Sequence, residues 1–106
     1  MTDLELVKFA AKAAGIEVRY QPITRRFLYQ KELPSDGFYL AYWAPLTDDG
    51  DALRLAVKLK MVVDPYAGVV AIPKDVVIAV LNEDDMMAAV RRAIVRAAAE
   101  IGKALP

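Results

Sequence analysis

The run VVIAVL, residues 76 to 81, constrains the fold more than any other part of the sequence. All six of its residues are apolar, so neither a period of two nor a helical period separates a wet side from a dry side. A run of this kind is typical of a strand that is buried on both faces. Because such a strand needs cover on each side, the run predicts a sheet with helices on both faces.

Three segments have the apolar spacing and the end signals of helices. Thr2 and Glu5 form a capping-box pattern and Gly15 is a left-handed stop, which together predict the first helix. A second helix is predicted over residues 49–60, and a third begins after Asn82 as its N-cap, with Gly102 loosening its end. The expected buried faces are Leu6, Phe9, Ala10 and Ala13, then Ala52, Leu55, Ala56 and Leu59, then Met87, Val90, Ile94, Ala97, Ala98 and Ile101.

Strand patterns occupy most of the remaining chain. Residues 16–20 alternate in polarity, residues 27–29 offer a second strand, and FYLAYW follows the turn ELPSDG, so an antiparallel meander is predicted. MVVD, VVAI and VVIAVL predict further strands. A length of 106 residues fits one domain. The prediction is therefore a single α+β domain over residues 1–106, a three-layer α-β-α sandwich with a mainly antiparallel sheet and helices on both faces.

Composition excludes several kinds of chemistry. The chain contains no cysteine and no histidine, which removes thiolate nucleophiles, sulfur ligands and the usual base near neutral pH. Lys+Arg and Asp+Glu balance at 14 each, so net charge does not favour nucleic acid. No apolar run approaches the roughly 20 residues of a membrane span, and the acidic start does not fit a signal peptide. We therefore expect an intracellular domain with no catalytic residues, no cofactor and no membrane partner.

The most chemical-looking motif is the acidic turn TDDGD, residues 47–51. Its leading interpretation is a helix start, in which Asp48 accepts a hydrogen bond from a free N–H group and Asp51 lies in the first turn. A calcium or magnesium site formed by Asp48, Asp49 and Asp51 is the alternative, although the spacing is not that of an EF-hand. An acidic patch that a partner recognises is a third interpretation.

Aromatic and basic side chains provide the candidate partner surface. The aromatic strand FYLAYW is either a core wall or an exposed patch, with Phe38, Leu40 and Tyr42 on one face and Tyr39, Ala41 and Trp43 on the other. The third helix carries Arg91, Arg92 and Arg96 along its flank and outer surface. A solvated face is the first interpretation of these arginines, and contact with phosphates is the second. Arg25 and Arg26, next to Phe27 and Tyr29, are a weaker nucleic-acid candidate. The partner surface candidates are Tyr39, Tyr42, Trp43, Arg91, Arg92 and Arg96.

Three stretches carry a family resemblance: MTDLELVKFAAKAAGIEV, WAPLTDDGDALRLAVKL and RRAIVRAAAEIG. Together they resemble the uncharacterised phage and prophage proteins that contain the phage α-β-α (ABA) sandwich domain. The middle stretch is the specific one, although this chain has Ala44 where the family usually has Asn. The resemblance implies a phage origin, the cytoplasm of a bacterial host and helices on both faces of a sheet. It implies no enzymatic activity.

The leading functional hypothesis is a small non-catalytic phage or prophage accessory protein. It would act by self-association, as a homo-oligomer, or by binding a host or phage protein. The first rival is a metal-dependent enzyme or small-ligand binder at Asp48, Asp49 and Asp51. The second rival is a weak nucleic-acid binder that uses Arg25, Arg26 and the arginines of the third helix.

Overall fold

Three helices and two antiparallel sheets make up the computed structural model, which describes residues 1–35, 37–72, 76–79 and 84–106. The helices are α1 (Asp3–Ala14), α2 (Asp49–Lys58) and α3 (Met86–Ala104). One sheet has the order β1-β2-β3 and the other the order β4-β5-β6. The strands are β1 (Arg19–Gln21), β2 (Arg26–Leu33), β3 (Gly37–Trp43), β4 (Val62–Asp64), β5 (Val69–Ile72) and β6 (Val76–Ala79). The α+β class and the antiparallel pairing are confirmed.

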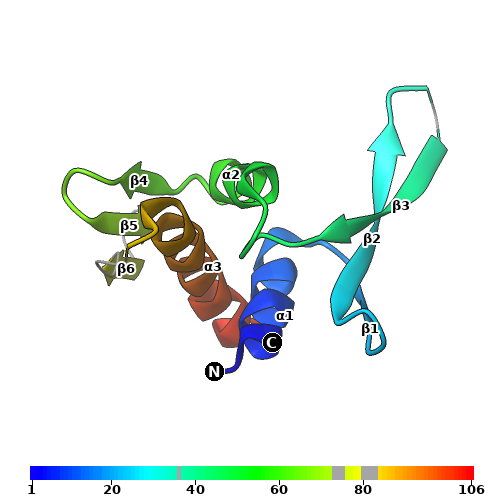
Figure 1. Ribbon diagram of the computed structural model, residues 1–106, viewed down its shortest axis with the longest axis horizontal. Coiled ribbons are helices and arrows are strands. Elements are labelled where there is room, and N and C mark those ends of the chain that lie inside the picture. The colour runs from blue at the N-terminus through cyan, green and yellow to red at the C-terminus, as the bar shows by residue number, and fades with distance from the viewer. Residues whose placement is uncertain (36, 73–75, 80–83) are drawn as a thin grey trace.

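The arrangement of the two sheets differs from the expected single sheet. In Figure 1 the helices lie between them, with β4-β5-β6 beside α3 and β1-β2-β3 beyond α1. The expectation that residues 76–81 form a central strand is wrong: β6 is at the end of its sheet, next to β5. Val70 of β5 is fully buried. Val80 and Leu81 are outside the described residues.

The ends of α1 and α2 follow from the residues that flank them. Thr2 and Glu5 form the predicted capping box, and Gly15 ends α1 in the left-handed conformation. Asp48 is the N-cap of α2. The N-cap of α3 is Asp85, and not Asn82, which lies outside the described part of the chain.

Small residues bring α1 and α3 unusually close together. A β-carbon at Gly102 would lie 1.8 Å from the carbonyl oxygen of Phe9, so only glycine fits there. The expectation that Gly102 loosens the end of α3 is therefore wrong, because this residue is a helix contact. The buried faces also differ in detail, since Met87 is exposed and Val7, Ala11 and Ala14 are buried.

The β2–β3 hairpin extends away from the helices (Figure 1). Its base belongs to the core, where Phe27 and Trp43 are buried. The Tyr20 ring packs on the Phe27 ring, with the two ring centroids 5.1 Å apart. Strand β1 pairs with β2 only over Arg26 to Leu28, and beyond that point β2 pairs with β3. We call residues 29–35 and 37–42 the hairpin arm. The arm helps to make the molecule elongated, at 40 × 29 × 28 Å.

Candidate functional site

The acidic turn before α2 is built around the backbone of the helix. The Asp48 carboxylate accepts a hydrogen bond from the Asp51 N–H at 2.8 Å. The carbonyl oxygen of Ala44 accepts hydrogen bonds from the N–H groups of Thr47 and Asp48, which closes the turn. The predicted helix-start role of Asp48 is therefore confirmed.

Asp51 is buried and joins this turn to the end of β3. Its side chain is 7% exposed and accepts hydrogen bonds from the Ala44 N–H at 2.9 Å and from the Arg54 guanidinium at 2.7 Å. The hydrogen bond to Asp51 raises the pKa of Arg54 above its ordinary value. Because a buried carboxylate needs such partners, Asp51 has a structural role in this turn.

Asp49 connects the same turn to α3. Its carboxylate accepts a hydrogen bond from the Arg91 guanidinium, which also donates to the Leu46 carbonyl oxygen at 3.0 Å. Each of the three aspartates thus has a partner within the protein. In the ranges that the structure describes, no group of three or more acidic, histidine or cysteine side chains could hold a metal ion. These contacts favour the helix-start interpretation over the metal alternative.

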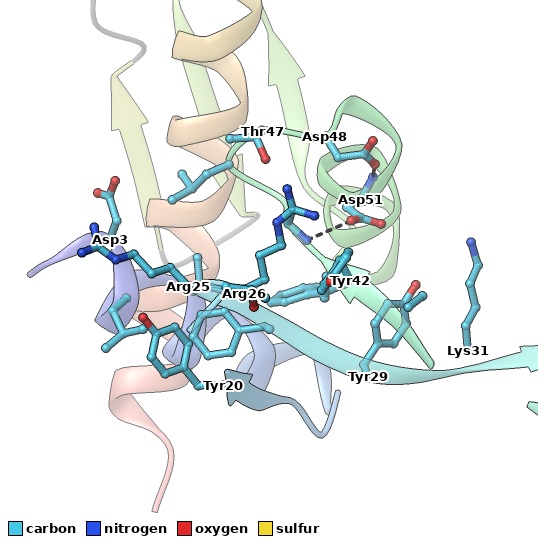
Figure 2. Close-up of a pocket in the computed structure, with 18 of the residues that line it drawn as sticks. Asp3, Tyr20, Arg25, Arg26, Tyr29, Lys31, Tyr42, Thr47, Asp48 and Asp51 are labelled. Atoms are coloured by element: carbon cyan, nitrogen blue, oxygen red, sulfur yellow. Dashed lines mark hydrogen bonds between the residues drawn. The ribbon is translucent and has the colours of Figure 1, made fainter. Parts of the chain in front are cut away.

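A concave pocket of about 880 Å³ lies between the hairpin and the start of α2 (Figure 2). Arg26 lies 4.6 Å above the centre of the Tyr42 ring, a cation–π contact on its wall. Burial, followed by the nearby Asp51 charge, raises the pKa of Tyr29 above its ordinary value. The charged side chains that line the pocket are Asp3, Arg25, Arg26, Lys31, Asp48, Asp51 and Arg54.

The charges in this pocket are mixed. Carboxylates lie among the cations, and the salt bridge between Arg54 and Asp51 neutralises one pair. The pocket therefore presents no uniform positive surface of the kind that binds a phosphate backbone. Separately, the turn between β1 and β2 carries some strain, because Arg25 has a left-handed backbone with a φ of 56°.

The predicted aromatic candidates fall into two groups. Tyr39 and Tyr42 are each 44% exposed on β3, as a partner surface requires. Trp43 is 4% exposed and packs in the core, so its prediction as a partner surface residue is wrong. The reason is its position at the base of the hairpin, opposite Phe27, where the sheet meets the helices.

The arginines of α3 do not form one open basic face. The Arg91 side chain is 15% exposed, so its interpretation as part of a solvated face is wrong. Arg92 forms an ion pair with Asp3 at 2.7 Å. Arg96 and Arg92 line a smaller pocket together with Glu100. Two of these three positive charges, those of Arg91 and Arg92, are therefore paired with aspartates of the same chain.

Two further exposed residues of β3 belong to the predicted aromatic strand, although the partner surface candidates did not include them. Phe38 is 58% and Leu40 is 62% exposed. With Tyr42 they share the face opposite that of Trp43, because side chains alternate along a strand. The alternation along FYLAYW indicates that these three side chains share a face, but only the packing of the hairpin decides which side chains are exposed, since Tyr39 shares the face of the buried Trp43 and is 44% exposed.

Comparison of the chain with protein-family models, curated proteins and solved structures gives no match. The resemblance to the phage α-β-α sandwich proteins therefore stays a prediction. Across the residues that the structure describes, no helix is long and apolar enough to span a membrane.

Proposed function

We propose that this chain is a small non-catalytic phage or prophage accessory protein that acts by binding protein through its hairpin arm. One observation carries the proposal. Phe38, Leu40 and Tyr42 lie on one face of β3 and are 58%, 62% and 44% exposed, on an arm that extends away from the helices (Figure 1).

The physical argument rests on the stability of such an arm. A two-stranded hairpin is marginally stable in water unless a third strand or another packed surface supports it. Over its outer part this hairpin consists of β2 and β3 alone among the described strands. A protein surface that packs on the arm would remove its apolar side chains from water and stabilise the two strands.

The non-catalytic part of the proposal is supported by the acidic turn and by composition. Asp48, Asp49 and Asp51 have structural partners, and the chain contains neither histidine nor cysteine. The phage or prophage setting, with the cytoplasm of a bacterial host, rests on the sequence resemblance.

Capture from lysate of a lysogenic or phage-infected bacterium tests the proposal. The immobilised chain is compared with a Phe38→Asp variant on the arm and a Leu53→Asp variant on α2, where Leu53 is also exposed. An untagged copy of the chain is added to the lysate, so that self-association can also be detected. Mass spectrometry identifies the captured proteins. Proteins retained by the wild type and Leu53→Asp but lost from Phe38→Asp support the proposal. Equal capture by all three chains, or no capture, contradicts it.

A further inference from the structure

The outer edge of β3 is long and uncharged. Strand β3 is the end strand of its sheet and reads GFYLAYW, with no charged residue and no proline from Gly37 to Trp43. An end strand exposes unpaired N–H and C=O groups along its outer edge, and proteins usually protect such an edge with lysine, proline or a bulge. The absence of these residues leaves β3 able to pair with another strand.

We propose that the partner of this edge is a second copy of the chain. The two β3 strands pair antiparallel about a twofold axis at Leu40, and the two sheets join into one of six strands. This inference rests on the protein-binding function proposed above and names its partner. A twofold interface uses the same surface on both subunits, so that surface must be complementary to itself.

Strand length and side-chain size favour this register. An axis at Leu40 pairs all seven residues of β3, whereas an axis at a neighbouring residue leaves strand ends unpaired. It places Leu40 opposite the partner's Leu40 and Phe38 opposite the partner's Tyr42. It also places Tyr39 opposite the partner's Ala41, a large residue beside a small one. Aromatic pairs directly across neighbouring strands are stabilising.

Length and charge distinguish β3 from the other end strands of the described residues. Like charges directly opposite each other destabilise a strand pair, and β3 has none to bring together. The end strand β1 has three residues and includes Arg19, while β4 has three residues and ends at Asp64. The end strand β6 is uncharged but has only four residues, against seven for β3. A twofold pair of any of these strands would be shorter, and a pair of β1 or β4 would also include like charges close to its axis. The β3 edge is therefore the best suited of these to bind its own copy.

The expected dimer is weak. A single pair of seven-residue strands gives a small contact, and interfaces below about 1,200 Å² are usually transient. We therefore expect a dissociation constant of about 1–100 µM, which calls for sedimentation velocity from about 1 µM to 1 mM. The wild type is expected to change from monomer to dimer within this range.

A matched pair of leucine variants tests the surface. Leu40→Lys places two positive charges together at the axis and is expected to weaken dimerisation by at least about tenfold. Leu53→Lys is the control, since Leu53 is 63% exposed against 62% for Leu40 but lies on α2. It is expected to dimerise like the wild type. If both variants dimerise like the wild type, or if both lose dimerisation, the β3 interface is refuted.

Two further experiments test the twofold register. A mixture of Leu40→Lys and Leu40→Glu chains is expected to form a heterodimer, because residue 40 faces its own counterpart. Since the chain has no cysteine, Leu40→Cys is expected to form a covalent dimer on oxidation, while Leu53→Cys forms no covalent dimer. No heterodimer and no covalent dimer would overturn the register. A wild type that stays monomeric up to about 1 mM would overturn the second-copy partner. In that case, capture of another protein that depends on Phe38 would still support the proposed binding function.

Discussion

The buried carboxylate of Asp51 accepts a hydrogen bond from the backbone N–H of Ala44 at 2.9 Å. This contact joins the first turn of α2 to the chain segment that leaves β3. Because Asp51 also accepts a hydrogen bond from Arg54, one side chain sets both the start of the helix and the position of the hairpin base. A residue that resembles a metal ligand in the sequence is thus a structural connector.

Replacing Asp51 tests this role. Asp51→Ala leaves the Ala44 N–H without its acceptor, so we expect the free energy of unfolding to fall by about 2–3 kcal/mol. Asp51→Asn keeps an oxygen acceptor and should lose less. Urea denaturation measures both changes, with the exposed Glu17→Ala as the control. A loss below about 0.5 kcal/mol in Asp51→Ala, the range of surface substitutions, would contradict the connector role.

Replacing Gly102 tests the helix contact. Glycine to alanine inside a helix normally stabilises it by about 1 kcal/mol. Here the added β-carbon meets the Phe9 backbone, so Gly102→Ala should instead destabilise the protein by at least about 2 kcal/mol. Thermal unfolding followed by circular dichroism measures the change. Gly15→Ala is the comparison: it has open space, and only its left-handed backbone should make it unfavourable, by about 1–2 kcal/mol. A stabilised Gly102→Ala variant would refute the close contact.

Two neighbouring arginines should differ in their effect on stability. Arg91 is largely buried and donates hydrogen bonds to Leu46 and Asp49, so Arg91→Met should lower the free energy of unfolding by about 2 kcal/mol. Arg92 forms a more exposed ion pair with Asp3, so Arg92→Met should cost less than about 1 kcal/mol. Chemical denaturation compares the two variants. Equal losses would show that the contacts of Arg91 add nothing beyond those of a surface ion pair.

The capping box of α1 predicts a dependence on acid. Hydrogen bonds from the Thr2 backbone and then its side chain lower the pKa of Glu5 from its ordinary value of 4.5. Because the folded pKa is the lower one, this stabilisation is fully present above about pH 4.5 and is lost as the pH falls through the folded value. Glu5→Gln should therefore be less stable than the wild type near neutral pH, with the difference shrinking in acid. A difference that does not change with pH would contradict this linkage, and Glu17→Gln is the control.

The sequence by itself determined the local structure, because caps, turns and apolar spacing act between residues a few positions apart. Thr2, Glu5, Gly15 and Asp48 mark helix ends where they were expected, and the antiparallel meander is present. The helix-start interpretation of the acidic turn was also available from sequence, since the N-cap bond spans only three residues.

Only the tertiary structure decided which side of each element is buried and which distant groups meet. The apolar run at residues 76–79 is an end strand, Trp43 belongs to the core, and Gly102 contacts Phe9 across two helices. Arg91 reaches a loop 45 residues earlier in the chain. Spacing within a segment cannot predict such contacts, because they depend on how separate elements pack and on which surfaces that packing leaves in water.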